Sequence, residues 1–216
     1  VSLSPNRKLL RSNWGVAENT ICVLFVGKFI SKKRPADLLE ALALLKASDS
    51  IHEYHALFVG EGELGEVLRQ QADVVFDASN GGSILSKANL SKPRCSFVGF
   101  LNQSQISQAY VAADILVLPS ESTETWGLVV NEALASGLPA IVSSACGCAE
   151  DLVLPLSPEL VYPCADIPSL ARSIHHLVTH PIAHQKIAAQ IAKYDFSVTV
   201  STLESLWYTL PRSQHE

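Results

Sequence analysis

Three segments of the chain end in the same three residues, Phe-Val-Gly. They are CVLFVG at 22–27, ALFVG at 56–60 and CSFVG at 95–99. Each is a short run of β-branched and aromatic residues stopped by a glycine, a pattern typical of strands buried on both faces of a parallel sheet. Because 48% of the 216 residues are hydrophobic, the chain can also bury one sizeable core. The repeated segment therefore predicts a parallel sheet within a single domain.

Three further apolar runs extend the expected sheet. They are DILVLPS at 114–120, PAIVSS at 139–144 and the weaker ELVYP at 159–163. Helical patterns lie between and after the strands, at 35–46, 62–75, 104–113, 128–137, 166–178, from Pro181, and at 195–209. This alternation predicts an α/β domain with a Rossmann-like doubly wound parallel sheet of about six strands and helices on both faces.

Two segments depart from the alternation. The stretch 76–94 is rich in Ser, Asn and Gly, so we expect an exposed insertion there. The first twenty residues are polar and the chain contains no Met, so we expect a polar lead-in within a longer protein.

Charge and cysteine content exclude several classes of protein. With 16 Lys and Arg against 21 Asp and Glu, the chain lacks the basic footprint of a nucleic-acid-binding module. No apolar run approaches the roughly 20 residues that a membrane-spanning helix needs. The five cysteines lack the spacing of a metal site or of a disulfide framework, which predicts reduced thiols in a cytoplasmic protein. The seven histidines fit no metal-binding frame, and no metal site is predicted.

Candidate ligand-binding residues follow the strands, because doubly wound sheets bind ligands beyond the carboxyl ends of their strands. The loop GKFISKKRP at 27–35 places four cations beside the start of a helix. A helix N-terminus carries partial positive charge and free N–H groups, so this loop suits an anion. A solvated charged turn is the alternative.

Two glutamates eight positions apart follow the fourth strand. Glu124 lies in the loop, and Glu132 lies about two turns into the next helix, so both can face one crevice. An ionised carboxylate accepts hydrogen bonds from neighbouring hydroxyls of a ribose or hexose. An exposed helical glutamate is the alternative. However, Glu132 lies within the apolar segment LVVNEALA, where an unpaired charge is costly, so we expect it to have a partner.

Gly60, Gly62 and Gly65 form the pattern G-x-G-x-x-G, which is typical of NAD(P)-binding domains when it follows the first strand. Here it follows the second. Asp77 has roughly the spacing of the acid that binds ribose, but we expect it at the edge of the insertion rather than at the end of a strand. We interpret Gly60 and Gly62 as allowing the turn to approach a nucleotide without a Cβ in the way. An NAD(P)-binding domain of an oxidoreductase is kept as an alternative.

Taken together, these segments resemble the C-terminal donor-binding domain of family 4 retaining glycosyltransferases of the GT-B fold. The resemblance covers about residues 20–205. Its most specific element is the E-x7-E motif within PSESTETWGLVVNEALASGLP at 119–139. It implies a hexosyltransferase that is metal-independent, uses no cofactor, and takes a UDP- or GDP-linked sugar as its donor.

The resemblance also assigns roles to residues. Lys28 and Lys33 would hold the donor diphosphate, with Lys28 at a position where the family has Arg, and would stabilise it as the leaving group. Glu124 would contact the transferred sugar, and Glu132 the ribose. The remaining donor-binding residues would be Gly27, Gly60 and Gly62, the backbone of Trp126, Gly127 and Leu128 at the helix start, and Phe100, Leu101 and Ile106 against the base.

The resemblance further implies how the domain is completed. Residues 1–216 would form one donor-binding domain, with 1–20 leading in from an N-terminal acceptor-binding domain that is absent, so that the isolated chain would be inactive. The acceptor, a saccharide, lipid or small molecule, and any association with a membrane surface would depend on that domain. The tail helix at 195–209 would expose Leu203, Leu206 and Trp207 as an apolar patch or as a contact for a second copy. A catalytically inactive module that binds nucleotide sugars is the other alternative.

Overall fold

The computed structural model describes residues 5–84 and 91–209, and within them an eight-stranded sheet runs in the order β4-β3-β5-β2-β1-β6-β7-β8. The strands are β1 (Ile21–Val26), β2 (Tyr54–Val59), β3 (Asp73–Asp77), β4 (Ser83–Ile84), β5 (Arg94–Gly99), β6 (Ile115–Leu118), β7 (Ala140–Ser143) and β8 (Val161–Tyr162). Seven strands are parallel, and only the two-residue β4 is antiparallel to its neighbour. The predicted Rossmann-like parallel sheet is confirmed.

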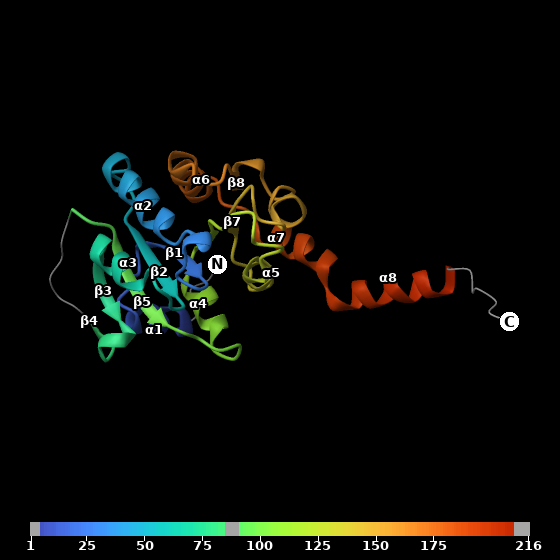
Figure 1. The fold of residues 1–216 in the computed structure, drawn as a ribbon, viewed down its shortest axis with the longest axis horizontal. Coiled ribbons are helices and arrows are strands. Elements are labelled where there is room, and N and C mark those ends of the chain that lie inside the picture. The colour runs from blue at the N-terminus through green and yellow to red at the C-terminus, as the bar shows by residue number, and fades with distance from the viewer. Residues whose placement is uncertain (1–4, 85–90, 210–216) are drawn as a thin grey trace.

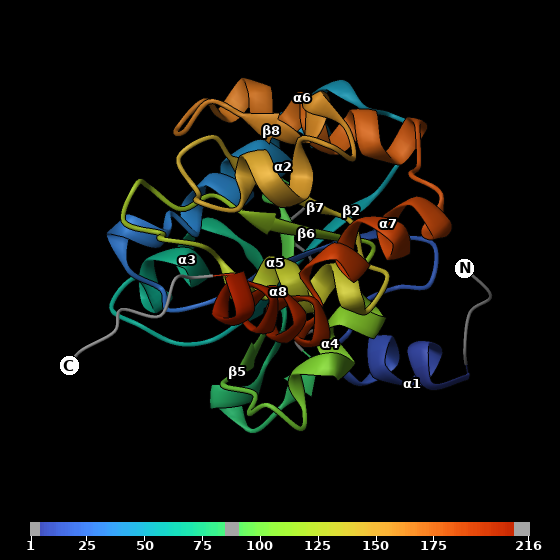
Figure 2. The same ribbon diagram turned by 90° about the vertical axis from the view of Figure 1, so that its right-hand side faces the viewer.

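Helices cover both faces of the sheet. They are α1 (Pro5–Asn13), α2 (Ala36–Ser48), α3 (Gly65–Gln71), α4 (Ile106–Ala112), α5 (Leu128–Ala135), α6 (Ile167–Thr179), α7 (His184–Ile191) and α8 (Phe196–Thr209). Helices α2 and α6 pack side by side over one face, and α1 and α4 pack together over the other (Figure 1, Figure 2). The strands between them are almost fully buried, because a parallel sheet must be covered on both faces.

The order of the strands defines where a ligand can enter. From β1 the chain proceeds to β2 on one side, and it later crosses to β6 on the other side of β1. The loops after β1 and β6 therefore diverge at a topological switch point, where open α/β sheets form a crevice.

Strand β3 corrects the prediction of a helix over 62–75. Helix α3 ends at Gln71, and the chain turns at once into β3, which pairs with β5. The prediction was wrong because β3 is short and no Gly or Pro separates it from the helix. Asp77 consequently lies at the end of a strand, not at the edge of an insertion. The expected insertion at 76–94 includes the last residues of β3, the short β4 and the start of β5, while 85–90 lie outside the described residues.

The predicted polar lead-in contains a packed helix, α1, although residues 1–4 lie outside the described part of the chain. Arg7 and Arg11 of α1 are buried, and both bind Asp114, at 2.5 Å and 2.9 Å. The backbone N–H of Cys22 donates to the same carboxylate at 2.8 Å. The two arginines, which make the segment polar in sequence, therefore dock it, because both pair with Asp114 and donate further hydrogen bonds to backbone carbonyls.

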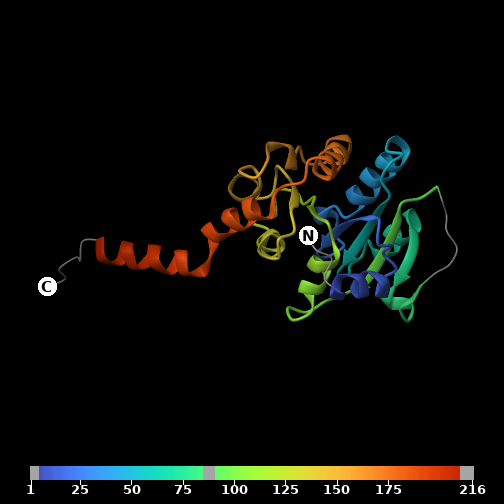
Figure 3. The same cartoon turned by 180° about the vertical axis from the view of Figure 1, so that it is seen from behind.

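Helix α8 leaves the body of the domain (Figure 1, Figure 3). Leu203, Leu206 and Trp207 are 61%, 50% and 69% exposed, so the expected apolar patch on the tail is confirmed. Contact with a second copy stays a prediction. Among the described residues no helix combines the length and apolar character needed to cross a membrane.

The cysteines are free thiols, as predicted. Cys146 and Cys148 are 4% and 0% exposed. Burial raises the pKa of the Cys148 thiol to about 12. Both therefore behave as small buried residues of a turn rather than as reactive groups.

Candidate functional site

A pocket of about 470 Å³ lies at the carboxyl ends of β1, β2 and β5. We call it the crevice pocket, and its lining residues are Val26, Gly27, Lys28, Val59, Gly60, Glu61, Phe100, Leu101, Asn102, Gln103, Ile106 and Glu132. A larger hollow of about 860 Å³ lies between α2 and α6, but it contains none of the predicted site residues. The crevice pocket is the one at the switch point, where this class of fold binds ligands.

Backbone hydrogen bonds join the loops that form this pocket. The N–H groups of Gly27, Phe29 and Gly60 donate to carbonyls of the neighbouring loops, at 3.0 Å to Val59, 2.9 Å to Glu61 and 2.9 Å to Gly99. The loops after β1, β2 and β5 thus continue the sheet's hydrogen bonding past the ends of the strands. We call these three bonds the loop ladder.

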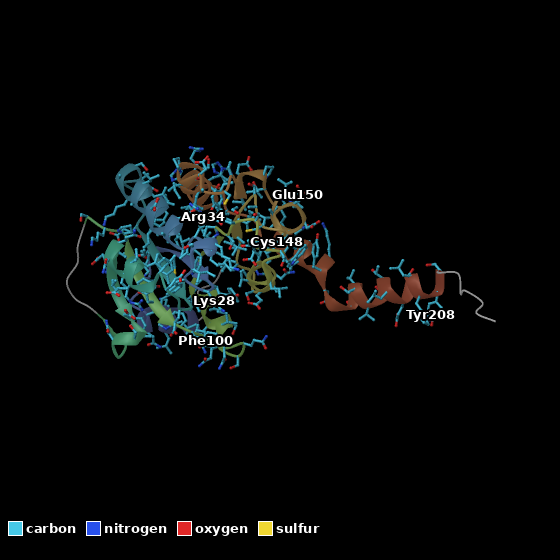
Figure 4. The ribbon with its side chains drawn as sticks, in the orientation of Figure 1. Lys28, Arg34, Phe100, Cys148, Glu150 and Tyr208 are labelled. Carbon is cyan, nitrogen blue, oxygen red and sulfur yellow. The ribbon has the colours of Figure 1, made fainter. Side chains whose placement is uncertain are left out.

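The pocket combines a cation with an apolar rim. Lys28 is exposed and forms no ion pair with the described residues. Phe100 is 75% exposed, while Leu101 and Ile106 are half-buried beside it. Lys28 and Phe100 lie at the same end of the sheet (Figure 4). An exposed ring next to an unpaired ammonium group suits a ligand that has both an aromatic part and an anionic part.

Glu132 is exposed on α5 rather than enclosed by apolar residues, and it nevertheless has the expected partner. The hydroxyl of Tyr110, a buried residue of α4, donates to Oε2 of Glu132 at 2.5 Å. Burial, and then the Glu132 carboxylate, raise the pKa of Tyr110 well above its ordinary value. The other oxygen of Glu132, Oε1, accepts no hydrogen bond from the described residues, so it is available to hydroxyl donors in the pocket.

A second polar group joins the loops after β1 and β6. The ammonium group of Lys33 donates to Oε2 of Glu124, and the Ser120 hydroxyl donates to the same oxygen at 3.1 Å. These lysine and glutamate side chains are 27% and 14% exposed. Lys33 and Glu124 thus contact each other across the loops that follow β1 and β6.

Arg34 is tied to the protein rather than open to a ligand. Its Nε donates to Asp37 at 2.8 Å, and its guanidinium lies 3.4 Å from Glu121. The hydrogen bond to Asp37 raises the pKa of Arg34. Of the four cations in the basic loop, Lys33 and Arg34 are paired to acids, which leaves Lys28 and Lys32 without an ion pair to the described residues.

The start of α5 lies beside Glu124. Gly127 has a φ of 99°, and a Cβ there would lie 2.7 Å from Leu118 and 3.7 Å from Cγ of Glu124. No side chain caps the helix, so the N–H groups of its first turn lack an intrahelical acceptor. The Trp126 indole, two residues before the helix, donates a hydrogen bond to Oδ1 of Asn131 at 2.7 Å. Leu128, the first residue of the helix, is 69% exposed.

Gly60 and Gly62 each make a close backbone contact between loops, and Gly60 also lines the crevice pocket. A Cβ on Gly60 would lie 2.0 Å from the carbonyl oxygen of Gly27, and one on Gly62 would lie 2.5 Å from that of Phe29. These glycines allow the β2 loop to pack against the β1 loop. Gly62 does not line the crevice pocket. Their spacing thus has a packing explanation that requires no dinucleotide.

Asp77 is likewise engaged within the protein. Arg69 holds it with hydrogen bonds of 2.5 Å and 3.1 Å, and the Ser79 hydroxyl donates to it at 2.7 Å. Burial alone would raise the pKa of Asp77, but these hydrogen bonds outweigh it and lower the pKa. The acid that an NAD(P) site would use on ribose is therefore already bound to Arg69.

The predicted site residues fall into two groups. The crevice pocket brings together Gly27, Lys28, Gly60, Phe100, Leu101, Ile106 and Glu132. Lys33 and Glu124 lie with Trp126, Gly127 and Leu128 at the β6–α5 loop and do not line that pocket. Sequence reasoning missed Tyr110 and Glu61. A buried tyrosine needs a hydrogen-bond partner for its hydroxyl, so the apolar stripe of α4 was a usable signal for Tyr110.

The parallel sheet, its helical layers and the crevice at its switch point define a Rossmann-like α/β domain. Residues 20–180 match the family model for group 1 glycosyl transferases. Because the match covers most of the chain, the chain belongs to this family, and the resemblance to family 4 enzymes of the GT-B fold is confirmed.

The two relatives described here are each 29% identical to this chain over the aligned residues. The sulfoquinovosyl transferase of Arabidopsis thaliana is 29% identical over 79% of this chain and 31% of its own length. A GDP-mannose-dependent alpha-mannosyltransferase of Mycolicibacterium smegmatis is 29% identical over 92% of this chain and 42% of its own. The chain thus spans less than half the length of these relatives.

A solved structure shares the fold. Anabaena HepE in complex with UDP-glucose superposes with a TM-score of 0.71 at 23% identity, over 96% of this chain and 54% of HepE. At that identity the likeness concerns the fold alone.

Proposed function

We propose that this chain is the donor-binding domain of a retaining glycosyltransferase and that it binds a nucleotide-diphosphate sugar. The observation that carries the proposal is the crevice pocket, which combines an apolar rim, the unpaired ammonium group of Lys28 and the carboxylate of Glu132. These three features match the base, the diphosphate and the ribose of such a donor. Membership of the glycosyl transferase family supports the same assignment.

The base and ribose would lie across the pocket. The exposed Phe100 ring, with Leu101 and Ile106, offers an apolar surface on which a base can pack. Glu132 would accept hydrogen bonds from the ribose hydroxyls through Oε1, because Tyr110 holds its other oxygen in place. A carboxylate that is already oriented loses less freedom when the ligand binds.

The diphosphate would lie between the two groups of site residues. Lys28 approaches from the crevice pocket, and Lys33 from the pair it forms with Glu124. An ammonium group has three donors, so Lys33 can bind a phosphate oxygen while it remains bound to Glu124. The uncapped start of α5 adds N–H groups and partial positive charge.

This arrangement would favour departure of the nucleotide diphosphate. As the bond from the sugar to the diphosphate breaks, negative charge grows on the leaving group, and Lys28 and Lys33 stabilise that charge more in the transition state than in the ground state. Glu124 would orient the hydroxyls of the transferred sugar. Because the two lysines and the helix supply the positive charge, this mechanism does not call for a metal ion.

The acceptor would be held elsewhere. Since the chain covers 31% and 42% of two relatives, we propose that an N-terminal acceptor domain completes the active site. The exposed apolar patch on α8 would pack against that domain. We expect the isolated chain to bind the donor without transferring its sugar.

Calorimetric titration of the chain with UDP-glucose and with GDP-mannose tests the proposal. We expect binding of one of them, and we expect Glu132→Ala to weaken it about 10-fold or more, the usual effect of losing hydrogen bonds to a charged group. Glu40→Ala, on an exposed position of α2, is the matched control and should bind like the wild type.

The outcomes separate the alternatives. Absence of binding by both donors, or equal binding by the Glu132 variant, contradicts the proposal. A change in nicotinamide fluorescence when NADH is mixed with the chain would instead favour the oxidoreductase alternative. If the chain joined to its acceptor domain binds the donor but transfers nothing, the inactive binding module is favoured.

A further inference from the structure

Three side chains that can bind metals meet at the end of the sheet opposite the crevice. Asp49 follows α2, His52 precedes β2, and His175 lies on α6. They come from segments up to 126 positions apart in the sequence. Figures 1 and 2 show α2 and α6 side by side, and this cluster lies where the end of α2 meets α6. None of the three lines the crevice pocket.

The three side chains converge on a single point. Nδ1 of His52 lies 2.9 Å from Oδ2 of Asp49, and Nδ1 of His175 lies 3.3 Å from the same oxygen. All the ligand atoms lie within 4.8 Å of one another. In a tetrahedral zinc site with bonds of about 2.0–2.1 Å, neighbouring ligand atoms are ~3.3 Å apart. The cluster therefore needs only small side-chain movements to surround an ion.

The hydrogen bonding of Asp49 is crowded without a cation. Its Oδ2 faces the Tyr54 hydroxyl at 2.7 Å as well as the two histidine nitrogens. A carboxylate has about two acceptor sites on each oxygen, so three donors exceed the capacity of Oδ2. If the two Nδ1 atoms instead share a cation with Oδ2, they offer lone pairs, and Tyr54 remains the one hydrogen-bond donor.

The surroundings of Asp49 suit a metal ligand. The Asp49 side chain is 4% exposed, and its Oδ1 accepts hydrogen bonds from the backbone N–H groups of Ile51 at 2.9 Å and His52 at 3.2 Å. Such contacts behind a ligand orient it and strengthen metal binding. Asp49 and His175 also line the hollow between α2 and α6, from which water can reach a fourth position.

We propose that Asp49, His52 and His175 bind a zinc ion that ties α6 to the junction of α2 and β2. Two imidazole nitrogens and one carboxylate oxygen form a ligand set that zinc prefers, and that magnesium and calcium do not. Because the site lies at the opposite end of the sheet from the crevice, the ion holds helices together and takes no part in binding the donor. The inference does not depend on the proposed function.

Zinc titration of the intact chain, after treatment with a chelator, tests the proposal. We expect one zinc ion per chain and a higher Tm with zinc than without, because a ligand that binds only the folded state stabilises it. Co²⁺ in place of zinc should give the absorption bands of a tetrahedral site. Magnesium should have no effect on the Tm.

Variants locate the ion. His175→Ala should abolish the rise in Tm while leaving the Tm of the metal-free chain unchanged, because this side chain is 48% exposed. Tyr54→Phe removes the contact behind Asp49 and should weaken zinc binding about 10- to 100-fold. The matched control is His176→Ala, the adjacent histidine on α6, whose ring stacks on His180 at 4.7 Å. It should bind zinc like the wild type.

Three results would overturn the proposal. They are the absence of a zinc-dependent change in the wild type, unchanged binding by His175→Ala, and loss of binding in His176→Ala, which would place the ion on the His176–His180 pair instead. The Tm of each variant without metal separates a binding defect from a folding defect.

Discussion

His55 should make the stability of the domain depend on pH. It lies on β2, is 1% exposed, and has its Nε2 2.9 Å from the Ser96 hydroxyl oxygen. The Ser96 hydroxyl donates its own proton to the carbonyl of Trp14 at 2.6 Å, so Nε2 of His55 must carry a hydrogen and donate it. Burial, and then the charges of Arg94 and Arg11, lower the pKa of His55 from 6.5 to about 3.

The direction and size of the effect follow from the two pKa values. Between about pH 3 and pH 6.5 the unfolded chain protonates this histidine while the folded chain does not, so the stability falls as the pH decreases. Each pH unit is worth ~1.4 kcal/mol. At pH 5, about 1.5 units below the unfolded pKa, His55 should cost the folded state ~2 kcal/mol compared with pH 8.

Urea unfolding at pH 8 and pH 5 measures this contribution. In His55→Gln the amide can still donate to Ser96 but does not titrate, so the variant should lose ~2 kcal/mol less than the wild type between these pH values. The comparison cancels the titration of all other groups. If wild type and variant lose the same free energy of unfolding to within ~0.5 kcal/mol, His55 is protonated in the folded state and the reasoning fails.

Three more predictions concern packing. Gly60→Ala should destabilise the domain by ~2 kcal/mol or more in urea unfolding, because the added Cβ would clash with the backbone of Gly27. Gly81 also has a positive φ, but a Cβ there would meet open space, so Gly81→Ala is the control. An equal loss of stability in the two variants would contradict the explanation. Asp114→Ala should lower the free energy of unfolding by ~3–5 kcal/mol in the same assay, because it leaves Arg7 and Arg11 buried without a counter-charge. A loss below ~1 kcal/mol would mean that the two guanidinium groups reach water. Removing 196–209 should change the Tm of the isolated chain little, since α8 is exposed; a large drop in calorimetry would show that α8 packs on the body.

The fold could be predicted largely because the central strands are apolar and end in glycine. The runs at 22–27, 56–60 and 95–99 became β1, β2 and β5. Strand β3 could not be found in this way, since its five residues directly follow a helix and alternate buried with half-buried positions. Helix α1 was missed because its docking depends on arginines, and only the three-dimensional contact with Asp114 makes them buried residues.

Part of the candidate site could be predicted because doubly wound sheets bind ligands beyond the carboxyl ends of their strands. That rule predicted Lys28, Lys33, Glu124 and Glu132 around one crevice. In the structure Lys28 and Glu132 line the crevice pocket, whereas Lys33 and Glu124 pair outside it. It could not reveal that Lys33 is paired with Glu124, since the two residues are 91 positions apart. The zinc-binding cluster lay beyond sequence reasoning for the same reason, because a helix–helix contact creates it.

The loop ladder has a consequence for how tightly a ligand can bind. Because main-chain hydrogen bonds already fix the loops after β1, β2 and β5, the backbone entropy of the pocket floor is lost when the protein folds and not when the ligand arrives. Only side chains remain to be ordered, at about 0.5–1.5 kcal/mol for each long one. The exposed Lys28 and Phe100 are the main contributors. Substitutions that shorten or stiffen them should therefore alter the entropy of binding more than the shape of the pocket.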